Sequence, residues 1–142
     1  MHNMPTIARC ITFALLIFPI TACHYTKTYT KSPTFRASTD SLGESIMKLV
    51  ACQKINLDGK EINTDGRDRT ALNIEILNPG NVSSNTDSLH TLGKEIAVVI
   101  KDGLTDPKSF EVLNVIFINQ KTTGGMSISS NRGFEYQADT LK

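Results

Sequence analysis

The sequence predicts an α+β domain, and three observations support this prediction. Two segments have helical periodicity, strand-like segments follow each of them, and glycine-containing turn signals separate those strands. The order of the elements is α-β-β-α-β-β. The simplest architecture for this order is a four-stranded antiparallel sheet with two helices on one face. The other face of the sheet then meets solvent or a partner.

Both predicted helices begin at the same four residues, Thr-Asp-Ser-Leu, at positions 39–42 and 86–89. Apolar residues follow at helical spacing: Leu42, Ile46, Leu49 and Val50 in the first segment, and Leu89, Leu92, Ile96, Val99, Ile100 and Leu104 in the second. Thr, Asp and Ser are preferred N-caps, because a side-chain oxygen accepts a hydrogen bond from the unpaired amides of the first turn. Ser41 with Glu44 also fits a capping box. The repeat therefore indicates two helix starts.

Two strands are predicted after the first helix, at 53–57 and 70–77, where apolar and polar residues alternate in the second segment. Asp65-Gly66 lies between them and is a typical hairpin turn. A second Asp-Gly pair, Asp58-Gly59, leaves the position of the turn open.

Two further strands are predicted after the second helix. Residues 110–119 are apolar on both faces, which is typical of a central strand. A turn containing Gly124-Gly125 follows, and the last strand runs from 126–129 to 133–137. Residues 131–133, Asn-Arg-Gly, are expected to form a bulge or a second turn.

The first 22 residues have the composition of an export signal. Arg9 and the amino terminus supply positive charge, and an uncharged, mostly apolar run extends from Ile11 to Ile20. This run is too short to span a bilayer, which needs about 20 apolar residues. The run leads directly into Thr21-Ala22-Cys23, so residues 1–22 are predicted to be a signal peptide.

Ile20-Thr21-Ala22-Cys23 resembles the lipobox of bacterial lipoproteins, although Leu is more frequent than Ile at the first position. The resemblance implies that Cys23 becomes the first mature residue and carries fatty acyl chains such as palmitate, which hold the protein on a membrane. In some Gram-negative lipoproteins, Asp directly after the anchor signals retention in the inner membrane. This chain has His24 at that position, so the resemblance implies an outer-membrane destination. No acidic run follows Cys23, so we expect the domain to face the periplasm.

Residues 23–37 are predicted to be the lipidated Cys and a flexible tether, followed by a small domain at 38–142. The tether is rich in Thr and basic residues, contains Pro33 and lacks apolar periodicity. Its local echo, Tyr-Thr-Lys at 25–27 and at 29–31, could instead place aromatic and basic side chains in the lipid headgroup layer. A solvated spacer is the preferred interpretation, since the lipid anchor makes a second membrane contact unnecessary.

The charge of the chain limits the classes of molecule it is expected to bind, and its cysteine content limits the disulfides it can form. The chain has 15 Lys and Arg against 14 Asp and Glu, and loss of Arg9 with the leader makes the mature chain neutral. This neutrality argues against nucleic acid as a partner. Cys10 is lost with the leader and Cys23 is lipidated, so Cys52 has no partner for an internal disulfide. We expect Cys52 to be a small buried apolar side chain.

Three short sequences resemble the O-glycosylation signal that one group of Gram-negative bacteria uses on exported lipoproteins. Asp precedes Ser41, Ser88 and Thr140, and a Leu follows each of them. The resemblance implies that these three hydroxyls are glycan acceptors. The alternative is that the first two belong to helix caps and the third to a frayed terminus.

Metal, cofactor and catalytic patterns are weak. No His-rich or Cys-rich set is present, so no zinc site is expected, and His90 is expected on the solvent side of the second helix. The acidic residues between the first two strands lack the spacing of a calcium loop and are expected in a solvated hairpin; they are Asp58, Glu61, Asp65 and Asp68. No cofactor is predicted.

The preferred interpretation is a noncatalytic lipoprotein, anchored to the envelope membrane, whose small domain binds an envelope protein or component through its open sheet face or an edge strand. A more specific version is an immunity or inhibitor protein that blocks a toxin arriving in the periplasm. The third alternative is an enzyme with a carboxylate site, for which the strand residues Glu75, Glu111 and Glu135 are candidates. The layout as a whole resembles small lipoproteins of Gram-negative bacteria.

Overall fold

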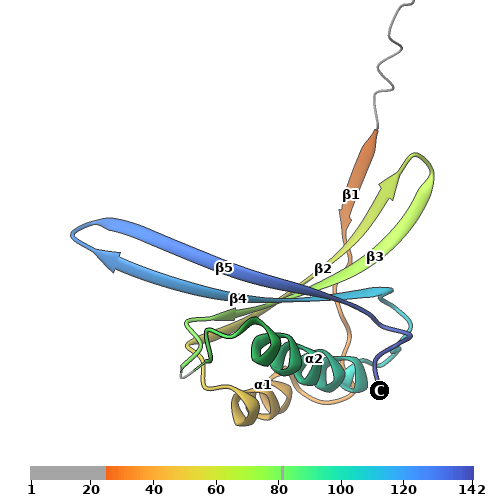
Figure 1. The fold of residues 1–142 in the computed structure, drawn as a ribbon. Coiled ribbons are helices and arrows are strands. Elements are labelled where there is room, and N and C mark those ends of the chain that lie inside the picture. Colours follow the sequence, from red (N-terminus) through yellow and green to blue (C-terminus); the bar gives the residue numbers. More distant parts are fainter. Residues whose placement is uncertain (1–24, 81) are drawn as a thin grey trace, which may run out of the picture.

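The computed structural model describes residues 25–80 and 82–142. In chain order the elements are β1 (Thr26–Thr30), α1 (Thr39–Leu49), β2 (Lys54–Thr64), β3 (Arg67–Leu77), α2 (Thr86–Gly103), β4 (Val112–Thr123) and β5 (Met126–Gln137). The five strands form one sheet in the order β1-β2-β3-β4-β5. Both helices lie on the same side of this sheet, and the two hairpins diverge beyond them (Figure 1).

The α+β class is confirmed, but the predicted four-stranded antiparallel sheet is wrong in two respects. First, β3 and β4 pair in parallel, with Ala71 opposite Val112. Parallel neighbours need a crossover of a dozen or more residues, and the segment containing α2 provides it. Second, part of the segment expected to be a tether forms β1, which pairs antiparallel with β2. All five residues of β1 are exposed, so the strand has no burial pattern that a sequence could show.

The two helices begin at the expected place, but their N-caps are Ser38 and Asn85, one residue before each repeat, so the expectation of a capping box at Ser41 and Glu44 is wrong. Ser38 caps α1 by accepting a hydrogen bond from the Ser41 amide, and Asn85 caps α2 by accepting bonds from the amides of Asp87 and Ser88. The Thr-Asp-Ser-Leu repeat therefore occupies the first turn, where Asp40 and Asp87 face the positive end of the helix dipole.

The core fills the space between the helices and one face of the sheet. β3 contributes Leu72, Ile74 and Ile76, which are fully buried. β4, predicted to be central, lies between β3 and β5 and contributes Leu113, Val115 and Phe117. The helices contribute Leu42 and Ile46 from α1, and Leu89, Ile96, Ala97 and Ile100 from α2.

Positive backbone φ angles mark the two hairpin turns. Asp65 and Gly66 have φ of 52° and 79°, and Gly124 and Gly125 have φ of 60° and 83°, as two-residue type I′ turns require. The structure thus places the first turn at Asp65-Gly66. The last strand is continuous through Asn131-Arg132-Gly133, so the expected bulge or second turn there is wrong.

Gly59 lies inside β2 at a point of close approach. The Lys31 amide donates to the Gly59 carbonyl at 2.8 Å. A Cβ added at Gly59 would overlap the Lys31 carbonyl oxygen and lie 2.8 Å from the Phe110 ring. The second Asp-Gly pair is therefore a packing site, where only a residue without a side chain fits.

The C-terminal segment is docked and not frayed. Ala138 and Leu141 are buried, and the Lys101 ammonium donates to the Leu141 carbonyl at 2.8 Å. Tyr136 on β5 donates its hydroxyl to the His90 carbonyl of α2 at 2.7 Å, and burial raises the pKa of Tyr136 to about 12. These contacts hold α2 against the last strand.

We predict opposite stability effects for the same substitution at two glycines. Gly59→Ala should lower the free energy of unfolding by at least about 1–3 kcal/mol, the usual range for overpacking. Gly43→Ala should raise it by up to about 1 kcal/mol, because Gly43 lies within α1 and an added Cβ meets nothing within 4 Å. Urea denaturation of both variants measures the two changes. Equal effects at the two positions would contradict the packing described for Gly59.

Candidate functional site

A groove of about 740 Å³ runs between α1 and the outer edge of β2. The wall from α1 includes Asp40, Glu44 and Met47, and the wall from β2 includes Ile55 and Leu57. Met47 is 51% exposed, whereas Ile55 and Leu57 are half-buried and pack against the core. The groove therefore combines apolar side chains from β2 and α1 with two carboxylates on its α1 wall.

β2 pairs with β3 along its inner edge, but in the described part of the chain no strand pairs with its outer edge along this groove. β1 pairs with β2 only from Lys60 to Thr64, and Lys31 adds one bond at Gly59 before the chain turns away. Because backbone groups alternate along an antiparallel strand, those of Ile55 and Leu57 point to the same side as those of Gly59. Within the described residues, no strand covers this edge at Lys54–Asp58.

Gly43 opens the groove on the helical side. This residue lines the groove in the middle of α1, where Gly costs about 1 kcal/mol relative to Ala. No packing contact demands the missing side chain, since an added Cβ would meet no atom within 4 Å. The gap leaves space for a ligand to approach the helix. Sequence reasoning missed this groove, and the glycine inside a predicted helix was its one signal.

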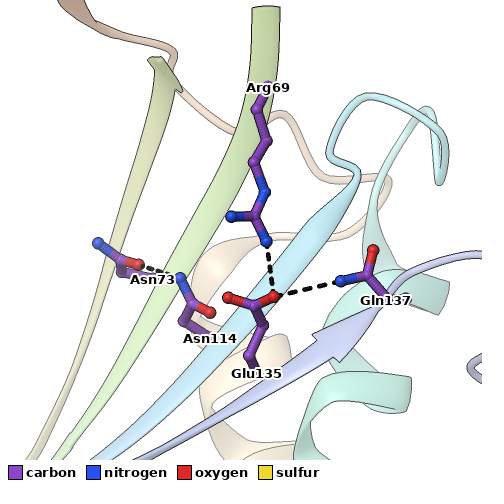
Figure 2. Close-up of polar contacts among 5 residues, drawn as sticks. All are labelled: Arg69, Asn73, Asn114, Glu135 and Gln137. Carbon is purple, nitrogen blue, oxygen red and sulfur yellow. Dashed lines mark hydrogen bonds and ion pairs between the residues drawn. The ribbon is translucent and has the colours of Figure 1, made fainter. Parts of the chain in front are cut away.

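The sheet face opposite the helices carries a polar network (Figure 2). Asn114 donates to Asn73 at 2.9 Å across the parallel pair. Arg69 reaches over β4 to Glu135, with Nη2 and Oε1 2.6 Å apart, and Gln137 donates to the same oxygen at 3.2 Å. The Arg69 and Glu135 side chains are about half exposed, so their ion pair adds little to stability. These five side chains are thus hydrogen-bonded to one another in two separate groups.

The three carboxylates considered for an enzyme do not form one cluster around a cavity. Glu135 is paired with Arg69, and Glu75 accepts a hydrogen bond from Asn56 at 3.2 Å. β4 separates these two glutamates, which places their strands about 10 Å apart. Glu111 precedes β4 and lines a separate hollow of about 610 Å³ with Lys101 and Lys108. The arrangement brings no pair of these residues together for acid–base chemistry.

The other residues singled out in the sequence have ordinary surroundings. Cys52 is half-buried, and burial raises the pKa of its thiol, which favours the unreactive protonated form. His90 is exposed, as expected, and its ring lies 5.5 Å from that of Phe134 and 5.3 Å from that of Tyr136. In the described part of the chain, no group of three or more His, Cys, Asp or Glu is arranged to hold a metal ion.

The three predicted glycan acceptors are exposed and lie in three different segments of the fold. Ser41 and Ser88 occupy the first turns of α1 and α2, and the Ser41 hydroxyl donates to the Ser38 carbonyl at 3.0 Å. Thr140 donates its hydroxyl to the Gln137 carbonyl at 2.9 Å. Glycosylation of these hydroxyls stays a prediction.

The predicted signal peptide at 1–22 and the predicted lipidation site Cys23 lie outside the described residues. Across residues 25–80 and 82–142, no helix has both the length and the apolar character needed to cross a membrane. Comparisons with protein-family models, with curated proteins and with solved structures find no match to this chain.

We predict that substitution of the N-cap residues lowers the stability of the protein more than substitution of the serines in the Thr-Asp-Ser-Leu repeats. Ser38→Ala and Asn85→Ala should each lower the free energy of unfolding by about 1 kcal/mol, because each leaves first-turn amides without an acceptor. Ser41→Ala and Ser88→Ala should cost clearly less, since their side chains accept no such bond here. Thermal denaturation measures the four values. The opposite ranking would return the cap role to Ser41 and Ser88.

Proposed function

We propose that this chain is a noncatalytic envelope lipoprotein whose domain binds an extended peptide segment of a partner protein in the α1–β2 groove. The observation that supports binding is the unpaired edge of β2 at Lys54–Asp58, lying beside a helix across a groove of about 740 Å³. A peptide added along this edge forms backbone hydrogen bonds with Ile55 and Leu57, and its alternate side chains enter the groove.

The groove chemistry defines the peptide. Ile55, Leu57 and Met47 favour apolar side chains at alternate positions of an extended strand. Asp40 and Glu44 are one helical turn apart on α1 and line the same wall, so a Lys or Arg near this wall is favoured. The partner segment is therefore an extended, alternating apolar peptide with a basic residue.

The anchor follows from the lipobox resemblance at Ile20-Thr21-Ala22-Cys23. Acylation of Cys23 holds the domain at the outer membrane on the periplasmic side, where its partner is an envelope protein. Several acyl chains give lasting attachment, because each buried methylene contributes about 0.8 kcal/mol.

We predict that Cys23→Ala releases the protein from membranes or leaves its leader uncleaved, because the substitution removes the thiol that carries the lipid. Membrane fractionation and intact-mass measurement in a Gram-negative host distinguish these states. A Cys23→Ala chain that is cleaved normally and stays with the membrane would contradict the anchor.

We predict that binding of a synthetic probe peptide depends on the groove. The probe is an extended hexapeptide that alternates Val and Thr and carries one Lys. It should shift the amide resonances of Ile55 and Leu57 and slow their hydrogen exchange, because a paired edge protects its amides. Gly43→Trp should weaken this binding at least about tenfold by filling the groove, a loss of about 1.4 kcal/mol.

Ser45→Trp is the matched control, because Ser45 is exposed on α1 and does not line the groove. This variant should bind the peptide as the unchanged protein does. Equal binding by both tryptophan variants, or resonance shifts confined to β5, would contradict the groove as the binding site.

A further inference from the structure

The N-terminal end of the described chain lies beside the β2–β3 turn. β1 pairs Thr26 with Thr64, and the Asp65 amide donates to the Tyr25 carbonyl at 3.3 Å. The ribbon shows β1 alongside this hairpin, with the start of β1 near the hairpin end (Figure 1). From Tyr25 onward, the chain is therefore part of the fold.

This pairing leaves almost no spacer between the fold and the proposed anchor, on which the inference rests. Cys23 precedes Tyr25 by two residues, and two residues reach at most about 7 Å even when fully extended. The Cα atom of Cys23 therefore lies within about 7 Å of that of Tyr25, and acyl chains attached there would hold this end of the domain close to the bilayer. The β2–β3 turn must then lie at the membrane surface.

The side chains at this end have the chemistry of a lipid headgroup layer. Tyr25 and Tyr29 are 67% and 54% exposed, and the Lys27 ammonium lies 5.3 Å from the centre of the Tyr25 ring. Tyr and Lys side chains place their apolar parts in the interface and their polar ends toward water. Both Tyr-Thr-Lys segments thus lie at this end of the fold, because Tyr29 is part of β1 and Tyr25 directly precedes it.

A hollow of about 580 Å³ lies on the opposite face of the same end. It is lined by Ile62, Thr64, Asp65, Arg67 and Arg69. The two arginines are two positions apart on β3, so they point to one face of the strand. One Arg69 nitrogen pairs with Glu135, and guanidinium has five N–H donors, so Arg69 retains donors for a second acceptor.

We infer that this end of the molecule, the membrane tip formed by Tyr25–Tyr29 and Ile62–Arg69, lies in the lipid headgroup layer and binds phospholipid phosphates between Arg67 and Arg69. Guanidinium groups bind phosphate with two parallel hydrogen bonds, which supports this choice of headgroup chemistry. The exposed tyrosines fix the depth of the tip.

The membrane tip also determines the direction in which the groove faces. α1 lies at the opposite end of the domain from β1 (Figure 1). About seven residues of β2 separate Leu57 from Thr64, which corresponds to about 24 Å along the strand. The membrane tip therefore presents the groove away from the bilayer, toward a partner in the periplasm.

The test uses the full chain, acylated in a Gram-negative host and reconstituted into vesicles. A fluorophore is attached to single cysteines at Thr64→Cys, Met47→Cys and Met126→Cys in a Cys52→Ser background. Brominated lipids should quench the label at Thr64 and leave the labels at Met47 and Met126 unchanged. Met126 lies at the end of the other hairpin and is 74% exposed, so it controls for surface exposure.

A separate variant tests whether Arg67 binds phospholipid phosphates. Arg67→Gln should reduce quenching at Thr64 in vesicles that contain phosphatidylglycerol, whereas Arg36→Gln, another exposed arginine, should not. Quenching that is indifferent to Arg67→Gln would overturn phosphate binding by the hollow.

Intact mass separates failure of the inference from failure of the proposed function. An acylated chain whose Thr64 label is not quenched would overturn the membrane tip and leave the lipoprotein proposal standing. A chain without acyl mass at Cys23 would overturn both.

Discussion

The close approach at Gly59 is the constraint on which the rest of the structure depends. The Lys31 backbone and the Phe110 ring both occupy the space that a side chain would take. The pairing of β1 with β2 ends at this contact, and the chain turns away after Lys31 toward the bridge between Phe35 and Leu104. The end of this pairing divides β2 into a covered half and an open half.

The two halves of β2 have different consequences. The covered half, Lys60–Thr64, holds β1 beside the β2–β3 turn and brings the N-terminal end of the described chain to that turn. The open half, Lys54–Asp58, leaves backbone groups beside α1, where Gly43 keeps the groove wide. We propose an anchor beside one end of β2 and a peptide groove beside the other, in which case β2 sets the orientation of the groove relative to the membrane.

The polar side chains of the open sheet face also differ from the backbone groups of the outer β2 edge in having hydrogen-bond partners among the described residues. On the open sheet face, Arg69 pairs with Glu135, and Asn114 donates separately to Asn73, so these four side chains already have protein partners, although Arg69 keeps further N–H donors. Among residues 25–80 and 82–142, no strand pairs with the outer β2 edge along the groove, and Ile55 and Leu57 line it. Unpaired strand edges tend to acquire a strand, so the edge, more than the polar face, is where a partner segment gains hydrogen bonds.

The sequence by itself determined the α+β class, the helix starts, the central position of β4 and the Gly124-Gly125 turn, because periodicity, first-turn chemistry and glycine turns are local properties. Only the tertiary structure decided the parallel pairing of β3 with β4, the strand at Thr26–Thr30 and the role of Gly59, since each depends on residues far apart in the chain. The groove belongs to this second group. The residues of the groove come from a helix and a strand, and the groove is open because the pairing of β1 with β2 stops at Lys60. No local sequence pattern indicates where this pairing stops.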